Sequence, residues 1–399
     1  MGPQSSQLSR VQHPIPQHNE TLRVLIDGRK LGHGGIGVYT ENLLRSFNAN
    51  TRLQLSVIVS PQAKKQFPWL SAFQCIQDDC KLYSVDELIF FPKRISLHNF
   101  DVFHIPHFTL PFGVHIPTVV TVHDLIHVTH PARPYYPFVT RRLLRSVVRR
   151  AAGVVTVSDA SRKEILKLCP AYADKVVTVS NGLDPTFCRD ATLPKPSSRQ
   201  IPAPYLLAVL SNLKPHKGVG DLIGAFHLLR KRSQAAPYLL LPRDLKLVIA
   251  GLGVEERAKL RHVIGTNGGS ADIHFIGAVP KEELITLYQG ALALVVSSHA
   301  EGFCLPALEA KALGTPVVSR PVLAVLEILG AEDTVCKDFS LEALADGMIA
   351  QVLRGLDGEG PPAVVARDIQ ARFSRERVSA ELLAVYENVV KDRLAVMRT

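Results

Sequence analysis

Two carboxylates, Glu301 and Glu309, lie in the segment 297–316, which carries the clearest chemical pattern of this sequence. The segment predicts a buried strand, a loop and then a helix with Pro306 in its first turn, a position that proline favours. Backbone N–H groups at such a helix start can hold an anion. A carboxylate accepts two hydrogen bonds, so Glu309 suits the vicinal hydroxyls of a ribose and Glu301 suits the hydroxyls of a sugar. A pair of surface charges is the alternative.

A glycine-rich turn, Gly32 to Gly37, follows a predicted strand and precedes a predicted helix. Glycine lets the backbone approach a ligand closely, and the helix start offers N–H groups to a phosphate. The spacing is not G-x-G-x-x-G, and no acidic residue ends the second strand, as a dinucleotide site would require. A plain tight turn explains this segment equally well.

A second loop with phosphate-binding character runs from Ser211 to Gly218. It also lies between a predicted strand and a predicted helix, so Lys217 could meet a diphosphate at the helix start. A solvated basic loop is the alternative.

Three histidines follow two neighbouring predicted strands: His104 and His107 at the end of 102–105, and His123 at the end of 118–122. The carboxyl ends of parallel strands form the ligand-binding edge of an open sheet. The histidine spacings fit no standard metal site. We expect one of the three to be functional and the others to be structural or merely nearby.

Residues 140–150 predict an amphipathic and strongly basic helix. Its apolar face carries Leu143, Leu144, Val147 and Val148. Such a helix could lie on an anionic membrane or guide an acidic lipid-linked substrate, and an ordinary packed helix with a solvated basic face is the alternative. The basic residues of its other face are Arg141, Arg142, Arg145, Arg149 and Arg150.

The elements that must position these residues are short apolar strands alternating with helices. Strands without polar alternation predict parallel sheets covered on both faces, and therefore an α/β doubly wound fold. The series stops near residue 180 and restarts at Tyr205, and residues 189–204 contain four prolines. We predict a disordered segment at 1–20, a first domain at 21–188, a linker at 189–204, a second domain at 205–373 and a helix at 374–399 that could pack back on the first domain.

The composition fits a globular protein of 399 residues with 46% hydrophobic residues and a net charge of +10. This charge favours anionic partners without choosing among phosphates, nucleic acid and acidic membranes. The six cysteines form neither a C-x-x-C pair nor a zinc cluster, which fits reduced thiols. The sequence has neither a secretory signal nor a long apolar run, so we expect a cytoplasmic protein. Peripheral contact with the inner face of a membrane is compatible with this expectation.

On these motifs the chain resembles glycosyltransferase family 4, a large group of retaining GT-B enzymes. The resemblance runs from about residue 22 to the C-terminus, and its most specific part is the E-x7-E motif of Glu301 and Glu309. It implies two doubly wound Rossmann-like domains that face each other across a cleft, the first binding the acceptor and the second the nucleotide-sugar. The other similar segments are Gly34-Gly35, Pro215-His216-Lys217, Ser158 to Ser161 and Asn181 to Asp184.

The resemblance implies that Glu301 touches the transferred sugar, Glu309 holds the ribose, Lys217 binds the diphosphate and His123 lies near the sugar and the acceptor. We therefore expect His123, Lys217 and Glu301 to be the catalytic residues. The expected donor-binding residues are Gly34, Gly35, Ser211, Asn212, His216, Lys217, Gly251, Gly302, Phe303, Cys304, Leu305 and Glu309.

Three positions depart from the family pattern. Cys304 stands where the family usually has glycine, Asn212 where a basic residue is common, and Leu326 where proline usually precedes Glu327. These departures bear on rate and donor preference rather than on fold.

The implied reaction is transfer of a hexose, with mannose favoured, from a nucleotide-sugar to a glycan or lipid-linked glycan in surface polysaccharide biosynthesis. Attack comes from the leaving-group face, and the phosphate takes the acceptor proton. Because no D-x-D motif ends a strand, we expect no essential metal, and we expect no other cofactor and no nucleic acid partner. The alternatives are a sugar-nucleotide epimerase of the same fold, a phosphorylase-type enzyme and a non-catalytic nucleotide- or glycan-binding scaffold.

Overall fold

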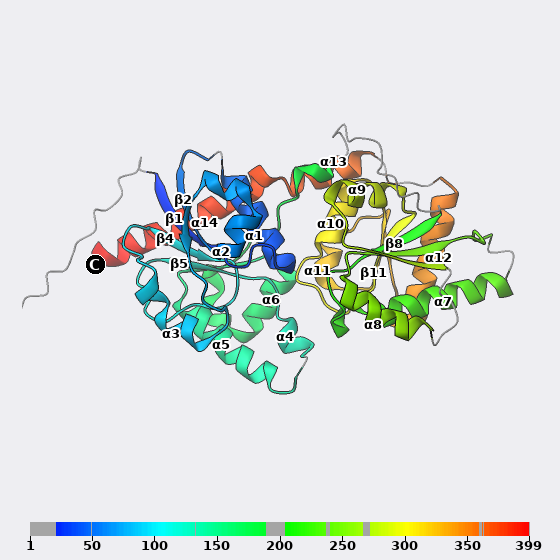
Figure 1. Cartoon of the computed structure of the whole chain (residues 1–399), viewed down its shortest axis with the longest axis horizontal. Coiled ribbons are helices and arrows are strands. Elements are labelled where there is room, and N and C mark those ends of the chain that lie inside the picture. Colours follow the sequence, from blue (N-terminus) through cyan, green and yellow to red (C-terminus); the bar gives the residue numbers. More distant parts are fainter. Residues whose placement is uncertain are drawn as a thin grey trace, which may run out of the picture.

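The computed structural model describes residues 21–48, 50–131, 133–188, 204–236, 240–265, 272–358, 361 and 363–398. The predicted disordered segment 1–20 and nearly all of the predicted linker, 189–203, lie outside these residues. Figure 1 shows two α/β halves side by side along the long axis of the molecule.

The first half contains a parallel sheet of seven strands in the order β3-β2-β1-β4-β5-β6-β7. Its central strands β4, β5 and β6 are buried over their whole length, because helices cover both faces, and this fits their mainly apolar sequences, VFHI, TVVTV and GVVT. The strands are β1 (Leu22–Asp27), β2 (Leu53–Val59), β3 (Gln74–Gln77), β4 (Val102–Ile105), β5 (Thr118–Val122), β6 (Gly153–Thr156) and β7 (Val176–Thr178).

The helices of the first half connect these strands and pack on the sheet. They are α1 (Gly34–Phe47), α2 (Pro61–Gln66), α3 (Val85–Arg94), α4 (Ile126–Thr129), α5 (Tyr136–Arg150) and α6 (Asp159–Leu168), with short 3-10 turns η1 (Pro68–Ala72), η2 (Pro170–Lys175) and η3 (Pro185–Phe187).

The second half contains a parallel sheet of six strands in the order β10-β9-β8-β11-β12-β13. The strands are β8 (Tyr205–Val209), β9 (Lys246–Ala250), β10 (Ile273–Gly277), β11 (Ala293–Val296), β12 (Val317–Ser319) and β13 (Thr334–Val335). Its helical segments are η4 (Pro215–Lys217), α7 (Val219–Ala235), α8 (Val254–Gly265), α9 (Lys281–Gly290), α10 (Leu305–Ala312), α11 (Leu323–Leu326), α12 (Leu341–Leu356) and α13 (Ala363–Arg372).

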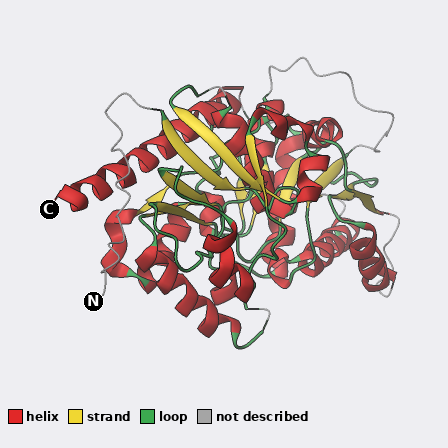
Figure 2. Ribbon diagram, turned by 60° about the vertical axis from the view of Figure 1, so that its left-hand side comes forward, coloured by secondary structure: helices red, strands yellow, loops and turns green. Residues whose placement is uncertain are grey.

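The last helix, α14 (Arg375–Arg398), belongs in space to the first half, where it lies against α1 and β5. Figure 2 shows it as a long helix reaching the far end of the molecule. The hydroxyl of Tyr386 lies 2.6 Å from Nδ1 of His104, inside the first domain. The chain therefore crosses between the halves twice.

Each sheet has a point where the strand order reverses, between β1 and β4 in the first half and between β8 and β11 in the second. Open parallel sheets bind ligands beside such a point, at the carboxyl ends of the strands. The loops that follow β1, β8 and β11 there are the three that the sequence singled out. The topology thus brings distant motifs to the same two sheet edges.

Candidate functional site

The turn that carries Lys217 is held against the end of β11 by backbone geometry. Gly218 has φ +61°, and a Cβ atom there would clash with the carbonyl oxygen of Ser297, so only glycine allows this close approach. The hydroxyl of Ser297 donates to the carbonyl oxygen of Lys217 at 2.8 Å, and the backbone N–H of His299 donates to that of His216 at 2.7 Å. The loops after β8 and β11 are therefore joined into one surface.

The Lys217 ammonium donates to both carboxylate oxygens of Glu301, at 2.7 and 2.9 Å. The hydroxyl of Ser298 donates to the same carboxylate at 2.6 Å. Burial alone would lower the pKa of Lys217, but the charge of Glu301 and the hydrogen bonds to it outweigh burial and raise this pKa. The ammonium of Lys217 is thus held charged, at the place where the sequence predicted phosphate and sugar binding.

Cys304 ends the loop and caps α10 with its backbone in the left-handed region, at φ 83°. Non-glycine residues rarely adopt this conformation, which fits the glycine that the family resemblance implies at this position. Burial, together with the charge of Glu301, raises the pKa of the thiol to about 12, so it stays protonated. Successive N–H groups beside a residue of reversed backbone handedness can form a concave anion site.

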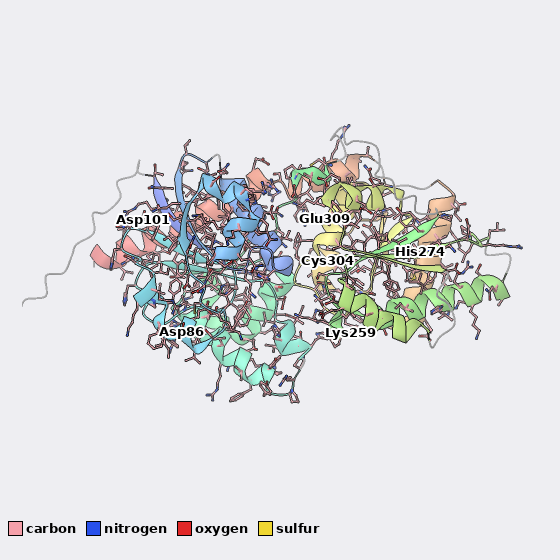
Figure 3. The ribbon with its side chains drawn as sticks, in the orientation of Figure 1. Asp86, Asp101, Lys259, His274, Cys304 and Glu309 are labelled. Atoms are coloured by element: carbon pink, nitrogen blue, oxygen red, sulfur yellow. The ribbon has the colours of Figure 1, made fainter. Side chains whose placement is uncertain are left out.

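Glu309 lies one turn into α10, and Figure 3 shows Glu309 and Cys304 on the side of the second half that faces the first. Its carboxylate accepts a hydrogen bond of 2.8 Å from the hydroxyl of Tyr288. Burial raises the pKa of Glu309 to about 7, although the Tyr288 hydrogen bond acts in the opposite direction. A carboxyl group in this state gains most from a ligand that donates hydrogen bonds to it.

Ser211 and Asn212, two of the donor-site residues predicted after β8, bond within their own loop. Asn212 donates to the hydroxyl of Ser211 at 3.1 Å and accepts from the backbone N–H of Lys214 at 3.1 Å. Burial lowers the pKa of His216, which favours the neutral ring. Gly251, at the end of β9, has φ 93° and packs so closely on the carbonyl oxygen of Leu210 that no side chain fits. Lys217 therefore carries the positive charge on the inner side of this loop.

The backbone of the glycine loop in the first half, at Gly34 and Gly35, is not covered by other residues. Gly34 has φ +61° and begins α1 together with Gly35. A Cβ atom at either position would meet nothing within 4 Å, so packing does not require glycine here. Open space before a helix start is what a ligand approaching the backbone needs.

His123 lies at the end of β5, with its ring edge-to-face on Tyr39 at 4.8 Å between centroids. Its Nε2 lies 3.0 Å from the carbonyl oxygen of Pro106, which fixes the proton on that nitrogen. Burial lowers the pKa of His123, so the ring is neutral and Nδ1 carries the lone pair. This histidine can orient a hydroxyl group but is a poor proton donor.

The other two histidines are structural. Nδ1 and Nε2 of His104 lie 2.6 Å from the hydroxyl of Tyr386 and 2.8 Å from that of Thr121, and burial lowers its pKa to about 3. His107 lies 3.2 Å from Asp27 and 2.8 Å from the hydroxyl of Thr109.

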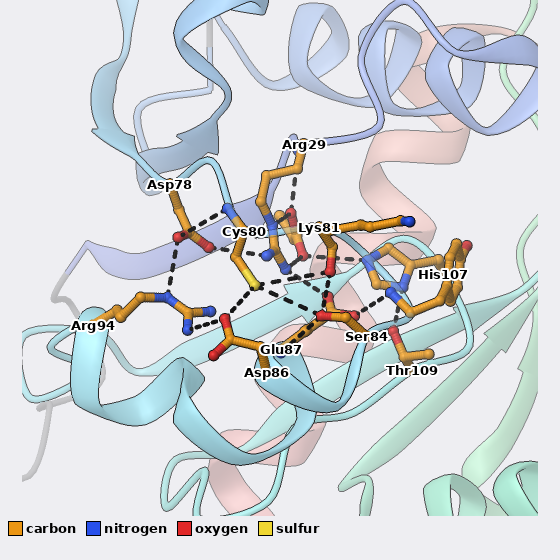
Figure 4. Close-up of polar contacts among 12 residues, drawn as sticks. Arg29, Asp78, Cys80, Lys81, Ser84, Asp86, Glu87, Arg94, His107 and Thr109 are labelled. Atoms are coloured by element: carbon orange, nitrogen blue, oxygen red, sulfur yellow. Dashed lines mark hydrogen bonds and ion pairs between the residues drawn. The ribbon is translucent and has the colours of Figure 1, made fainter.

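His107 belongs to a buried charge cluster that the sequence did not reveal (Figure 4). Arg29 donates to Asp27 at 2.6 and 2.9 Å, to Asp78 at 2.9 Å and to Glu87 at 2.8 Å. Asp27, Glu87 and His107 bring their ligand atoms within 4.8 Å of one another, as in a metal site. The guanidinium of Arg29 already supplies the positive charge between the two carboxylates, so the cluster fits a structural ion network better than a metal centre.

Two family models match this architecture half by half. The model "Glycosyltransferase Family 4" matches residues 33–187, and the model "Glycosyl transferases group 1" matches residues 195–355. The chain belongs to the group 1, family 4 glycosyltransferases. The resemblance inferred from the motifs is thereby confirmed.

Curated relatives of this glycosyltransferase include O-antigen chain mannosyltransferase B of Escherichia coli, which is 28% identical over 72% of this chain and 74% of its own length. The MMP alpha-(1->4)-mannosyltransferase of Mycolicibacterium hassiacum is 29% identical over 65% of this chain and 59% of its own length. Glycogen synthase of Mycobacterium tuberculosis is 29% identical over 73% of this chain and 65% of its own length. The alignment thus spans less than two thirds of the second and third relatives.

Solved structures confirm the GT-B fold of this glycosyltransferase. Anabaena HepE in complex with UDP-glucose superposes with a TM-score of 0.70 at 15% identity, covering 92% of this chain and 100% of that one. Sucrose-phosphate synthase of Thermosynechococcus elongatus superposes with a TM-score of 0.68 at 16% identity, covering 93% and 100%.

The two domains of this glycosyltransferase touch beside the site through residues that the sequence did not mark as interdomain contacts. The hydroxyl of Ser161 donates to the carbonyl oxygen of His123 at 3.1 Å and lies 3.5 Å from that of Gly302. A Cβ atom at Gly302 would clash with the carbonyl oxygen of His123, so glycine is required where the domains meet. This contact places His123 next to the loop of Glu301.

Glu327 makes a second bridge between the domains. Its carboxylate accepts the backbone N–H groups of Asp159 and Ala160, at 3.0 and 2.7 Å, at the start of α6. A carboxylate at a helix N-terminus is stabilised by the unpaired N–H groups and the helix dipole. The family motif that ends in Ser161 therefore contributes to domain contact.

A pocket of about 370 Å³ lies beside the Lys217 turn of this glycosyltransferase. It is lined by the outer side of that turn and by α8, with Lys214, Asp221, Lys259 and His299 among its polar residues. The residues predicted from the sequence as donor-binding lie outside its lining.

The basic helix predicted at 140–150 is the larger part of α5. Leu144, Val147 and Val148 are buried as expected, while Arg141, Arg142, Arg145 and Arg149 are exposed. The prediction that Arg150 belongs to the exposed basic face is wrong. This residue is half-buried and donates to the carbonyl oxygens of Leu110 and Pro111, with its guanidinium over the ring of Phe112. In the described part of the chain, no helix has the length and apolar character that crossing a membrane requires.

Proposed function

We propose that this glycosyltransferase moves a hexose, with mannose favoured, from a nucleotide-sugar to a glycan or lipid-linked glycan, with retention at the anomeric carbon. The similarity to two mannosyltransferases supports the sugar. The name of the first of these relatives supports a role in the biosynthesis of a surface polysaccharide.

The observation that carries this proposal is the position of Lys217, Glu301 and Glu309 around the start of α10, with His123 of the first domain against the loop of Gly302. In the proposed complex, Glu309 accepts the ribose hydroxyls and Glu301 accepts hydroxyls of the transferred sugar. Lys217, the N–H groups of residues 303–305 and the loop of Gly34 and Gly35 bind the diphosphate.

In the reaction, the bond between C1 of the sugar and the diphosphate oxygen breaks, and the acceptor oxygen forms a new bond to C1 on the same face. The acceptor proton passes to the leaving phosphate oxygen. The protein stabilises the negative charge that grows on this phosphate, and one such donor contributes about 3–4 kcal/mol in well-studied enzymes. The neutral ring of His123 orients the sugar or the acceptor hydroxyl.

We propose that this charge stabilisation needs no metal ion, because Lys217 and the backbone N–H groups supply it. Transfer should therefore persist in excess EDTA. Loss of activity that magnesium or manganese restores would contradict this part of the proposal.

We also propose that α5 contacts an anionic membrane when the acceptor is lipid-linked. Its exposed arginines lie on the same helix as Phe138 and Val139, which are 63% and 53% exposed. Basic residues beside exposed apolar ones favour the interface of an anionic membrane. Arg150 is excluded from this contact because its guanidinium is held by the protein.

The test begins with a thermal-shift screen against GDP, UDP and ADP sugars, followed by turnover with the best donor. Transfer to a mannose-containing acceptor, with the product's anomeric configuration assigned by NMR, is the expected result. Binding without turnover would support a scaffold instead. An isomerised donor sugar in the absence of acceptor would support an epimerase, and release of sugar phosphate with inorganic phosphate would support a phosphorylase-type enzyme.

A further inference from the structure

A row of aromatic side chains leads away from the candidate site across the first domain. The ring centroids of Tyr83 and Phe108 lie 5.8 Å apart, those of Phe108 and His127 6.4 Å, and those of His127 and Tyr136 5.9 Å. Tyr135 continues the row, 5.0 Å beyond Tyr136. The rings come from loops, from α4 and from the start of α5, so the row is a product of the fold and not of one amphipathic element.

The row is open to a ligand. Tyr83 is 44% exposed and Tyr135 is 54% exposed, while Phe108 and Tyr136 are half-buried beside the exposed His127. Burying aromatic surface is a large source of stability, so a continuous exposed series is unusual and marks a binding surface.

The row passes close to the candidate reaction centre. His127 lies on α4, four residues after His123, and the short segment between them is fixed by Asp124, whose carboxylate accepts the N–H of Ile126 at 2.9 Å. Asp124 also faces Gly302, because a Cβ atom at Gly302 would lie 3.0 Å from the Cβ atom of Asp124. A molecule on the row therefore passes close to His123 and the sugar-binding loop.

Tyr83 is held in a strained backbone conformation, with φ 62°, a value that a tyrosine rarely adopts. Its N–H donates to the carboxylate of Glu87 at 2.6 Å, and Glu87 is fixed in turn by Arg29 of the buried cluster. The ammonium of Lys30 lies 4.7 Å from the centre of the Tyr83 ring. Strain of this kind persists where the surrounding structure enforces it, commonly at functional sites.

We propose that Tyr83, Phe108, His127 and Tyr136 bind a saccharide acceptor, stacking on the apolar faces of successive sugar rings. This inference rests on the proposed function and specifies its acceptor as an oligosaccharide rather than a single sugar or small polyol. A pyranose presents C–H groups on its faces, which the electron-rich face of an aromatic ring attracts. The far end of the row lies at the start of α5, the helix that carries the exposed arginines, which suits an acceptor whose other end carries an anionic lipid phosphate.

The test uses variants that separate the ring from the backbone. Tyr83→Gly removes the ring but accepts φ 62° without strain, and Tyr83→Phe keeps the ring. His127→Ala shortens the row at its middle. Phe90→Ala is the matched control, because Phe90 is 43% exposed on α3 of the same domain and outside the row.

Binding of α-mannose oligosaccharides of increasing length is measured by calorimetry on the full chain saturated with GDP. We expect Tyr83→Gly and His127→Ala to weaken binding of the longer oligosaccharides by roughly three- to tenfold, the range for one aromatic contact, with little effect on mannose itself. Tyr83→Phe and Phe90→Ala should bind as the wild type does. Oligosaccharide affinity that does not grow with length in the wild type, or that Tyr83→Gly leaves unchanged, overturns the inference.

Turnover separates this inference from the proposed function. If the wild-type protein binds longer oligosaccharides more tightly but transfers no sugar, the proposed function is contradicted. The inference that the aromatic row binds an oligosaccharide would then still stand. Transfer with length dependence that is equal in the wild type and Tyr83→Gly would contradict the row alone.

Discussion

The ammonium of Lys217 lies within 2.9 Å of both carboxylate oxygens of Glu301. The two residues are 84 positions apart and come from the loops after β8 and β11, the pair of strands between which the strand order reverses. In the proposed complex each residue takes a new partner, the diphosphate for Lys217 and the sugar hydroxyls for Glu301. Donor binding therefore exchanges one set of charge-assisted hydrogen bonds for another. Before the donor arrives, the ion pair keeps both side chains ordered.

Replacing Lys217 tests the diphosphate role. Lys217→Gln should lower kcat/KM for the donor by about a hundred- to a thousandfold, as loss of one charge-stabilising donor does elsewhere, and should weaken nucleotide diphosphate binding. Initial rates and calorimetry measure the two effects. Lys231→Ala, at an exposed lysine of α7, is the control. Activity of Lys217→Gln near that of the wild type would refute the role.

Nucleotide affinity should depend on pH through Glu309. Its carboxyl pKa in the ligand-free protein is about 7, so ionisation lowers folded-state stability as the pH rises through that value. Ribose hydroxyls stabilise the carboxylate and lower this pKa, so affinity should rise with pH up to about 7 and then level off, with proton release on binding. Calorimetry in buffers of different ionisation enthalpy measures the release. Glu309→Gln should abolish it, and unchanged release in that variant would assign the proton elsewhere.

Cys304 should tolerate glycine better than any larger residue. The left-handed backbone disfavours a side chain by about 1–2 kcal/mol, and Cys304→Gly removes that strain. Glycine also raises the entropy of the unfolded chain, which lowers stability by about 0.4–1 kcal/mol and offsets only part of the gain. We therefore expect Cys304→Gly to unfold at a temperature equal to or above that of the wild type and to retain full transfer. Cys304→Val, with a branched Cβ atom, should be less stable. Thermal unfolding that ranks these variants in the reverse order would disprove the strain.

Glu327 should control contact between the domains. Glu327→Ala removes two hydrogen bonds at the start of α6, so the two domains should separate more readily. We expect kcat to fall by about tenfold, which corresponds to an increase of about 1.4 kcal/mol in the activation free energy. Small-angle scattering should show a larger radius of gyration in the ligand-free variant. Glu342→Ala, at an exposed glutamate in the first turn of α12, should change neither quantity.

The cluster around Arg29 should be essential for stability. Arg29→Met leaves Asp27, Asp78 and Glu87 buried without their shared cation, and breaking a buried ion pair in this way costs about 3–5 kcal/mol. Urea unfolding measures the loss. Arg45→Met, which breaks an exposed pair with Glu41, should cost less than about 1 kcal/mol. In the wild type, burial would raise the pKa of Asp27 but Arg29 lowers it, so this stabilisation should be lost as the pH falls below about 4.

Local patterns in the sequence were sufficient to predict the alternating strands and helices, and with them the parallel sheets. Lys217, Glu301 and Glu309 could be singled out because each lies between a buried strand and a helix, where side-chain type and backbone geometry point to one chemistry. The fold and the family are confirmed, while the roles of these residues remain predictions.

Contacts between distant parts of the chain could not be predicted in this way. Arg29 looks like a surface arginine in a turn, and only the fold brings Asp78 and Glu87 around it. Arg150 has the same helical spacing as its neighbours, but carbonyl groups 39 and 40 residues away remove it from the basic face. The strain at Tyr83 likewise depends on Glu87 and Arg29.

The packing of α14 on the first domain has a consequence for biosynthesis. His104 lies inside the first domain, yet its partner Tyr386 follows 282 residues later in the chain. Domains tend to fold as they leave the ribosome, but this one lacks part of its interior until the second domain has been made. The first domain should therefore remain incompletely folded during translation, and the two domains should complete their folding together.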